Sequence, residues 1–150
     1  MTSAATLFFK DKNERIPMKE LVVTARIDNL HEVTDFVNAE LERHHCPQEL
    51  QNKIDLAVEE IFVNIANYAY TPSSGWAAVS IDVDEDAVIR FEDVGKFYNP
   101  LEHPEPDFDK PLKERKIGGL GVFFVKKMMD KIEYERVDNK NVLVITKKIK

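Results

Sequence analysis

The chain has 150 residues, which is enough for one domain with a single hydrophobic core. Its 27 acidic and 21 basic side chains give a net charge of -6, so its surface would repel a phosphate backbone and direct binding to nucleic acid is not expected. A lone cysteine, Cys46, excludes an internal disulfide, and the sequence shows neither a signal peptide nor an apolar run of the roughly 18 residues that would span a bilayer. We therefore expect a cytoplasmic protein with no membrane partner.

The first 18 residues have no clear periodicity, and we predict that they form either a tail or an extra edge strand. A β-branched, apolar run at 19–25 predicts the first strand of a single domain that covers residues 19–150. A helix is predicted to follow this strand, with Asp28 or Asn29 as its N-cap.

The longest predicted helix begins at Pro47 and ends near Tyr70, where a Pro-Ser-Ser-Gly segment interrupts it. Apolar residues at helical spacing mark the face that packs on the core: Leu50, Ile54, Ala57, Ile61 and Ile65. The segment before this helix, His44-His45-Cys46, holds three possible metal ligands. Consecutive residues cannot easily converge on one ion, so we interpret this segment as an ordinary helix-ending loop.

Polar residues on the long helix fall into two groups. Glu60, Asn64 and Asn67 share one helical face and have apolar residues on both sides. Asp55 and Glu59, by contrast, fit an ordinary solvated face. Since a carboxylate in apolar surroundings needs a partner or a task, Glu60 and Asn64 are candidate functional residues.

Alternating apolar and polar residues predict two strands, 76–83 and 87–93, joined into an antiparallel hairpin. In the second strand Asp93 shares a face with Phe91, so its carboxylate is predicted to point with the apolar side chains. Gly95 follows and permits a tight turn beside whatever Asp93 holds. The alternative is that Asp93 caps a turn through its own backbone.

The segment from Asn99 to Pro111 contains four of the seven prolines, so neither a helix nor a central strand is predicted there. Together with the glycines that follow, it makes a connection of about 20 residues, a length typical of a functional loop or lid. Gly118, Gly119 and Gly121 then precede an apolar run with helical spacing. Such a loop can turn backbone N–H groups toward a phosphate at a helix N-terminus, although it is neither a P-loop nor a dinucleotide fingerprint, and a buried helix often begins this way.

A last hairpin, with strands at 132–136 and 142–149, completes the predicted order. This order is strand, two helices, two strands, loop, helix, two strands. Three helices must then cover one face of a mostly antiparallel, mixed sheet. The predicted fold class is therefore an α+β two-layer sandwich.

Three short motifs follow one another along the chain: Glu60-x-x-x-Asn64, Asp93-x-Gly95 and Gly119-x-Gly121. In this order and at these separations they resemble the N, G1 and G2 boxes of the GHKL superfamily, which includes gyrase, a heat-shock ATPase, histidine kinases and MutL and shares the Bergerat ATP-binding fold. Within this superfamily, the chain is similar to bacterial anti-sigma factor serine kinases in three segments: Ala-Val-Glu-Glu-Ile-Phe-Val-Asn, Asn-Pro-Leu and Ile-Gly-Gly-Leu-Gly-Val-Phe. The resemblance extends from about Lys19 to Ile149.

The resemblance implies that the chain binds ATP and Mg²⁺. Asp93 would accept a hydrogen bond from the adenine amino group, and Gly95 would let the base approach. Asn64 would be the Mg²⁺ ligand, and Glu60 would orient or deprotonate the attacking hydroxyl as the catalytic residue. Further nucleotide contacts are implied for one more helix residue and for the last box: Asn67, Lys116, Gly118, Gly119, Leu120 and Gly121.

The implied function is an ATP-dependent protein serine/threonine kinase that acts as an anti-sigma regulatory factor. Its partners would be a sigma factor and an anti-sigma antagonist protein of the STAS type, and the resemblance also suggests a homodimer. Phosphorylation of the antagonist in trans is expected because the sequence shows no second phosphoacceptor helix. Two alternatives are a nucleotide-gated switch that exchanges partners without phosphotransfer, and a domain that binds no nucleotide.

Overall fold

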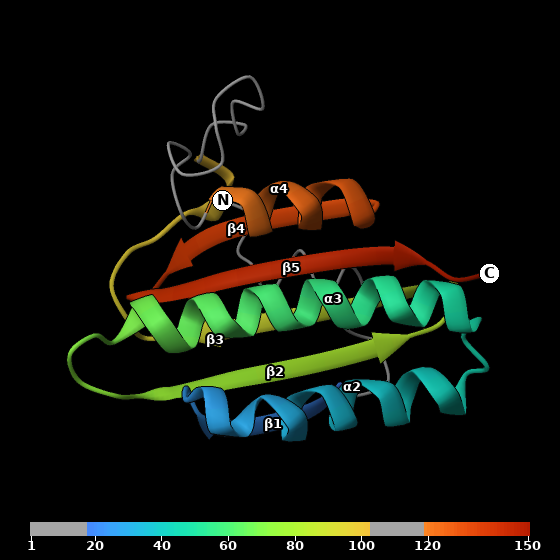
Figure 1. Cartoon of the computed structure of the whole chain (residues 1–150), viewed down its shortest axis with the longest axis horizontal. Coiled ribbons are helices and arrows are strands. Elements are labelled where there is room, and N and C mark those ends of the chain that lie inside the picture. Colours follow the sequence, from blue (N-terminus) through green and yellow to red (C-terminus); the bar gives the residue numbers. More distant parts are fainter. Residues whose placement is uncertain (1–17, 103–118) are drawn as a thin grey trace.

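In the part of the chain that the structure describes, a five-stranded sheet carries three α-helices on one of its faces (Figure 1). The computed structural model describes residues 18–102 and 119–150, so the predicted N-terminal tail or edge strand and most of the predicted lid lie outside the described residues. The strands are β1 (Lys19–Thr24), β2 (Trp76–Val83), β3 (Asp86–Asp93), β4 (Lys131–Val137) and β5 (Lys140–Lys148). The α-helices are α2 (Leu30–Arg43), α3 (Gln48–Asn64) and α4 (Gly119–Met128).

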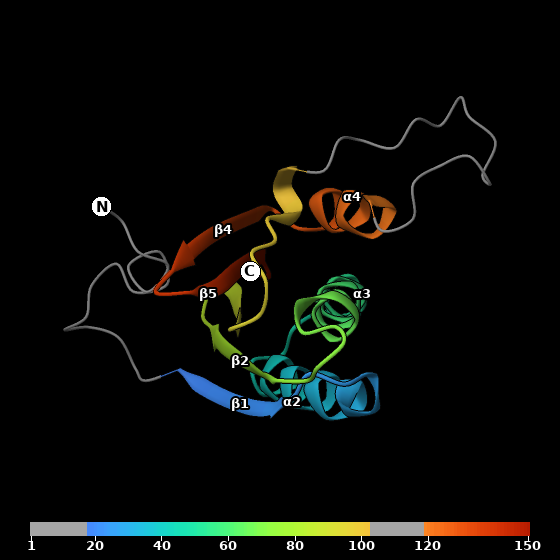
Figure 2. The ribbon, with the colours of Figure 1, turned by 90° about the vertical axis from the view of Figure 1, so that its left-hand side faces the viewer.

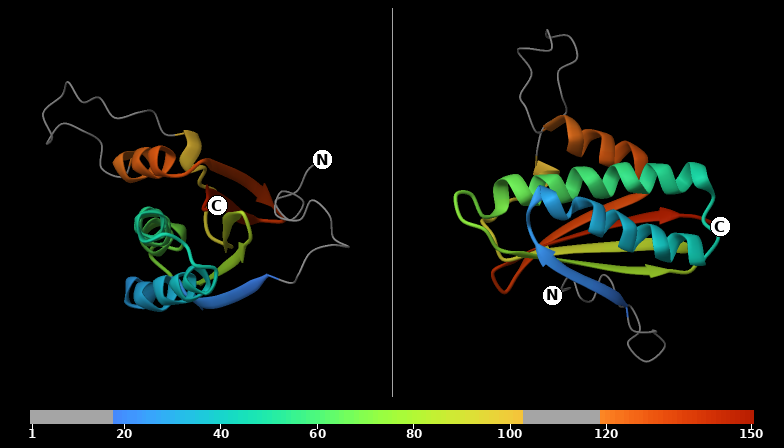
Figure 3. Two further views of the ribbon diagram at one scale, coloured as in Figure 1. Left: turned by 90° about the vertical axis from the view of Figure 1, so that its right-hand side faces the viewer. Right: turned by 60° about the horizontal axis from the view of Figure 1, so that its bottom comes forward.

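The strand order is β1-β2-β3-β5-β4, and all four pairings among these strands are antiparallel. Helix α3 lies between α2 and α4 on the covered face (Figures 2 and 3). The predicted α+β two-layer sandwich is confirmed, but the sheet is not mixed as predicted, because every pairing among the described strands is antiparallel. Because β5 lies between β3 and β4, the end of β3 is placed beside the start of β5, where Asp93 pairs with Asn141.

The core lies between the helices and the covered face of the sheet, where the predicted alternation is confirmed. Helix α2 contributes Val33, Val37 and Leu41, and α3 contributes residues on its predicted apolar face. Every second residue of the central strands packs against them, and the largest of these side chains are Ile81, Ile89, Phe91 and Ile145. Each such side chain stabilises the fold by about 1.5–3 kcal/mol relative to an exposed position.

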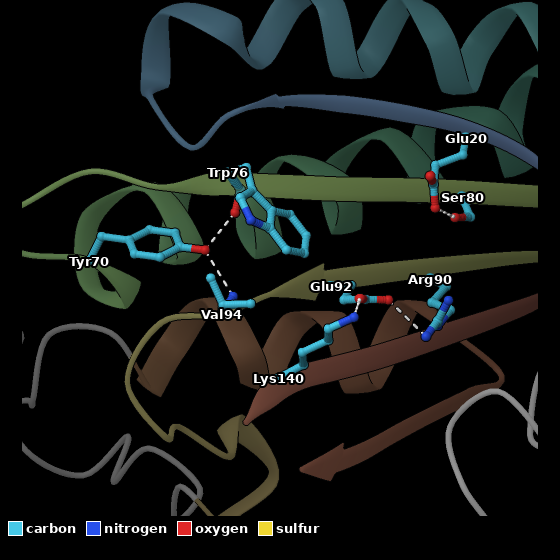
Figure 4. Close-up of polar contacts among 8 residues, drawn as sticks. All are labelled: Glu20, Tyr70, Trp76, Ser80, Arg90, Glu92, Val94 and Lys140. Atoms are coloured by element: carbon cyan, nitrogen blue, oxygen red, sulfur yellow. Dashed lines mark hydrogen bonds and ion pairs between the residues drawn. The ribbon is translucent and has the colours of Figure 1, made fainter. Parts of the chain in front are cut away.

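The long helix differs from its prediction at its C-terminal end. Helix α3 ends at Asn64 and continues as a π-helical turn over Ile65–Ala69. The hydroxyl group of Tyr70 then donates a hydrogen bond to the carbonyl oxygen of Trp76 (2.6 Å) and accepts one from the backbone N–H of Val94 (2.8 Å), as Figure 4 shows. The end of the helix is therefore tied to both β2 and the segment after β3.

One prediction about polar residues is wrong. Asp55 does not lie on a solvated face: it is half-buried, and its Oδ1 is buried without a hydrogen-bond partner among the described residues. The error arises because the burial of Asp55 depends on packing between elements, which helical periodicity does not contain. Asn29 occupies the N-cap position of α2, as predicted, but its side chain makes no capping bond, because its Nδ2 donates to the carbonyl oxygen of Thr24 at 2.8 Å.

Smaller differences affect the turns. A short 3₁₀ turn occupies Pro100–Glu102, within the segment where no helix was predicted. The last hairpin closes with only two residues, Asp138 and Asn139, which both have positive φ values (50° and 63°) as a tight primed turn requires. None of the helices in the described part of the chain has the length and apolar composition needed to cross a membrane.

Candidate functional site

A cleft opens between the end of α3, helix α4, the segment after β3 and the neighbouring strands β4 and β5. The space between its lining atoms is about 600 Å³ when the open solvent at its mouth is included. Most of its lining is apolar or aromatic. The polar exceptions, apart from tyrosine hydroxyls, are Asn64, Asp93, Lys96 and Asn141.

Asp93 lies in this cleft at the end of β3 and is only 4% exposed. Its Oδ1 accepts two hydrogen bonds, from the backbone N–H of Gly95 (2.9 Å) and from Nδ2 of Asn141 (3.0 Å). The bond from Gly95 is the turn-capping contact that the sequence left open as an alternative. It uses only one oxygen, and Oδ2 has no hydrogen-bond partner among residues 18–102 and 119–150.

The electrostatic environment of Asp93 makes this second oxygen a strong acceptor. Burial raises the pKa of the Asp93 carboxyl, and the hydrogen bonds from Asn141 and Gly95 oppose that shift without cancelling it. A carboxylate oxygen without a donor is unfavourable in a mostly apolar cleft. A ligand that brings an N–H donor into the cleft would therefore bind favourably at this position.

Asn141 was not predicted as a site residue, yet it organises the polar side of the cleft. Besides Asp93, its Nδ2 donates to the carbonyl oxygen of Lys96 (2.7 Å). Its Oδ1 accepts hydrogen bonds from the hydroxyl of Tyr134 (2.5 Å) and from the backbone N–H of Tyr98 (3.3 Å). The residue is 7% exposed, so these bonds fix the Asp93 carboxylate and the segment after β3 in one arrangement.

Asn64, the last residue of α3, lines the same cleft as Asp93. Glu60 lies one helical turn earlier, is half-buried, and is not part of the cleft lining. Its carboxylate lies against Gly121, where any Cβ atom would collide with Oε2. Two of the three predicted motifs therefore meet directly at this contact, and Asp93 joins Asn64 across the cleft.

The glycines of the last motif lie in a different position from the predicted one. Helix α4 begins at Gly119, so Gly119 and Gly121 belong to its first turn rather than to a loop before it. Val122 and Val125 of the same helix line the cleft. The N-terminus of α4 is consequently placed beside the cleft, although Lys116 and Gly118 lie outside the described residues.

Gly95 is required by close packing of the backbone. A Cβ atom there would lie 2.6 Å from the Cβ of Ala69, at the end of the π-helical turn. The next residue, Lys96, donates its backbone N–H to the carbonyl oxygen of Ala69 (2.9 Å). The segment after β3 is thus held against the end of α3, and the predicted approach of a base at Gly95 stays a prediction.

The residues that line the cleft differ in part from the residues that the sequence predicted to bind the nucleotide. Asn67 is exposed on the π-helical turn and is not part of the cleft lining. The side chain of Leu120 is not among those described. Conversely, the sequence did not indicate Tyr68, Tyr98 or Tyr134, which line the cleft. Aromatic residues scattered over three elements carry no local signal, because only the fold brings them together.

Two curated relatives are similar to about two thirds of this chain. The serine-protein kinase RsbW of Halalkalibacterium halodurans is 33% identical over 99 residues, 63% of this chain and 60% of that protein. The serine/threonine-protein kinase BtrW of Bordetella bronchiseptica is 26% identical over 100 residues, 65% of this chain and 70% of that protein. The chain therefore aligns with about three fifths of the length of the first relative.

Two solved structures share the fold. The RsbU and RsbW domains of a Mycobacterium tuberculosis protein match 90% of this chain and 34% of that one, with a TM-score of 0.61 and 14% identity. The histidine kinase domain of a blue-light activated histidine kinase from Erythrobacter litoralis matches 81% of this chain and 60% of that one, with a TM-score of 0.51 and 15% identity. The family profile of the histidine kinase-like ATPase domain matches residues 23–147, which covers most of the sandwich and the whole described cleft. This chain belongs to the histidine kinase-like ATPase domain family.

Proposed function

We propose that the cleft binds ATP and that the chain is a protein serine/threonine kinase. The observation that carries this proposal is the Asp93 carboxylate: it is buried in the cleft, held by Asn141 and Gly95, and has one oxygen without a partner among the described residues. An adenine amino group is a donor of the kind that this oxygen needs. The apolar and aromatic lining of the cleft suits a planar base.

The residues around the cleft also suit Mg²⁺. Asn64 makes no side-chain hydrogen bond with any other described residue, so its amide oxygen is available as a hard ligand. The described residues contain no cluster of three His, Cys, Asp or Glu side chains that could hold an ion alone. This fits Mg²⁺, which usually takes one or two protein ligands and completes its shell with phosphate oxygens and water. Bound Mg²⁺ would neutralise charge on the phosphates.

The remaining predicted contacts would hold the phosphates. The N-terminus of α4, which begins at Gly119, would present backbone N–H groups and the positive end of the helix dipole. Gly118, Leu120 and Gly121 would contribute backbone donors, and Lys116 a positive charge. Asn67, which is exposed, would reach the nucleotide only at the rim of the cleft.

Glu60 would act on the protein that receives the phosphoryl group. Its carboxylate lies beside the first turn of α4, one helical turn from Asn64, so it is close to the proposed phosphate end of the cleft. There it would orient the serine or threonine hydroxyl of the partner and accept its proton. The kinase names of both curated relatives support phosphotransfer to such a hydroxyl.

The proposed partners are a sigma factor and an anti-sigma antagonist protein of the STAS type, the second of which would be phosphorylated in trans. Support for these partners comes from the resemblance of the sequence motifs to anti-sigma factor kinases and from the similarity to RsbW. A homodimer of the chain is part of the same proposal.

Calorimetry with Mg-ATP and transfer of labelled γ-phosphate to an antagonist domain test this function together. Glu60→Gln should bind ATP within about twofold of wild type and lose transfer by about 10²–10⁴-fold, because the amide cannot accept the proton. Glu59→Gln, an exposed neighbour on the same helix, is the matched control and should retain both properties. Transfer by Glu60→Gln at the wild-type rate would remove Glu60 from the mechanism. If the wild-type chain binds ATP tightly but leaves the antagonist domain unlabelled, the alternative function, a nucleotide-gated switch without phosphotransfer, is supported instead.

A further inference from the structure

The sheet face that points away from the three helices, called the open face below, is buried along its central strands. Val142 and Val144 of β5 point to this face and are each 2% exposed. Ser80 of β2 and Glu92 of β3 are also buried. By contrast Val22, on the edge strand β1, is 58% exposed. The three helices lie on the opposite face of the sheet (Figures 2 and 3). They therefore do not bury these residues.

Charged side chains surround the valine strip on the open face. Glu92 forms ion pairs with Arg90 (2.8 Å) on its own strand and with Lys140 (2.9 Å) on β5, as Figure 4 shows. The hydroxyl of Ser80 donates to the carboxylate of Glu20 at 3.2 Å. These contacts place a polar network beside Val142 and Val144, on strands that remain in register across the whole sheet.

Two polar atoms on this face are buried but unpaired. Among the described residues, Nε of Arg90 has no acceptor and Oε2 of Glu135 has no donor. Arg90 of β3 pairs with Val144 and Glu135 of β4 pairs with Val142 in the sheet register, so the two unpaired atoms belong to the strands on either side of the valine strip. A face with an apolar strip, a buried N–H group and a buried carboxylate oxygen needs a cover that supplies apolar surface and charges of both signs.

A segment of this composition precedes Met18 in the sequence. Met18, where the described chain begins, packs against the cluster of Val142 and Val144. The 17 residues before it carry apolar side chains at Leu7, Phe8, Phe9 and Ile16 and a stretch of alternating charges, Lys10-Asp11-Lys12-Asn13-Glu14-Arg15. Fully extended they could reach about 56 Å, whereas five strands span only about 19 Å between their outer axes.

We propose that residues 1–17 dock on the open face of the sheet. Leu7, Phe8 and Phe9 would cover the valine strip, and the charged stretch would supply an acceptor for Arg90 and a donor for Glu135. While the segment is docked, neither a partner protein nor a second copy of the chain can use this face. Partners are then directed to the helix side and to the cleft.

Thiol labelling in the full-length chain tests this proposal. In a Cys46→Ser background, Val144→Cys places a reporter under the proposed cover. Ile145→Cys, the next residue on β5, is 1% exposed on the helix side and serves as the buried control. Val22→Cys is the exposed control. We expect Val144→Cys to react with a small maleimide far more slowly than Val22→Cys, because labelling must wait for local opening.

The cover is then disrupted by Leu7→Asp, Phe8→Asp and Phe9→Asp together. This should raise the labelling rate at Val144→Cys by about tenfold or more, with no change at Ile145→Cys, because only the open face loses its cover. Thr2→Asp, Ser3→Asp and Thr6→Asp add the same charge to the same segment and should change neither rate. An unchanged rate at Val144→Cys in the apolar triple variant overturns the proposal, and so does a rate that falls as protein concentration rises, since a second copy would then be the cover.

A photocrosslinking residue at position 8 in place of Phe8 gives a second, independent measurement in a chain that keeps its apolar character. Crosslinks within one chain to peptides from β3, β4 or β5 are expected. Crosslinks between two chains, or to α2 and α3 only, overturn the proposal even where the triple variant fails to fold.

Discussion

Glu92 and Asp93 are consecutive residues of one strand, but they occupy opposite faces of the sheet and have different surroundings. Glu92 points to the open face and is paired with two cations, Arg90 and Lys140. Asp93 points to the cleft, where its hydrogen bonds come from two neutral groups, the Asn141 amide and the Gly95 backbone. Both residues are nearly inaccessible to solvent.

The difference shows how a buried carboxylate can be assigned to structure or to binding. A carboxylate that is neutralised by adjacent cations has its charge compensated within the fold. A carboxylate that keeps a free oxygen and a raised pKa retains an unmet demand for a donor, which a ligand can satisfy. We therefore expect substitutions at Glu92 to affect stability and substitutions at Asp93 to affect nucleotide binding.

The largest expected effect is that of Asp93→Asn on ATP affinity. The amide places a donor or a weaker acceptor where the adenine amino group requires an acceptor, so calorimetry should show a dissociation constant at least about 100-fold higher. The free energy of unfolding should not fall by a comparable amount, because the substitution removes a buried charge. An unchanged affinity would contradict the assignment of Asp93 to the base.

Glu92→Gln should have the opposite profile. Arg90 and Lys140 lose their shared carboxylate, and since Lys140 is partly exposed we expect the free energy of unfolding to fall by about 1–2 kcal/mol. Urea denaturation measures this change, and ATP affinity should stay within about twofold. Glu133→Gln is the control, because its ion pair with Lys131 lies near the surface and should contribute less than about 0.5 kcal/mol. A large loss of ATP affinity in Glu92→Gln would contradict the expectation that Glu92 supports the fold while Asp93 serves nucleotide binding.

Asn141→Ala tests whether Asp93 depends on its neighbour for orientation. Without the amide, the Asp93 carboxylate keeps only the hydrogen bond from Gly95, and Tyr134 loses its acceptor. ATP should bind about tenfold more weakly, and selectivity for ATP over GTP should decrease, because a mobile carboxylate discriminates less between base edges. A loss of stability without any change in selectivity would mean that Asn141 only supports the fold.

The smallest effect concerns Asp55, a third partly buried carboxylate, on α3. Burial first and the nearby charge of Glu42 raise its pKa, although a hydrogen bond with Asn38 opposes them. An acid whose pKa is higher in the folded state loses stability as pH rises from its unfolded pKa, about 3.9, through its folded pKa. Asp55→Asn should therefore raise the free energy of unfolding at pH 7 by up to about 1 kcal/mol, discounted for partial exposure.

The gain from Asp55→Asn should largely disappear at about pH 3, where the aspartate is mostly protonated in both states. Urea denaturation at the two pH values measures it, and Glu59→Gln on the exposed side of the same helix should show no gain at either. A gain that persists at low pH would mean that packing, not charge, is responsible.

Periodicity in the sequence was sufficient to predict the direction of a side chain where that direction depends on a single strand or helix. Strand alternation predicted that Asp93 points with Phe91, and helical spacing predicted that Glu60 and Asn64 share a face inside apolar surroundings. Both patterns follow from side-chain directions that the backbone of a strand or helix imposes. Asp55 was misplaced because its burial depends on packing between α2 and α3, which the periodicity of α3 does not record.

The sequence by itself determined the type and order of the elements, the apolar face of each, and the motifs that indicate the family, because these are local properties of the chain. Only the tertiary structure decided that β5 lies between β3 and β4. That insertion pairs Asn141 with Asp93, 48 residues apart, and supplies the hydrogen bond that fixes the carboxylate in the cleft. The physical reason is that strand order and register are set by the packing of the whole sheet against its helices, not by any single strand.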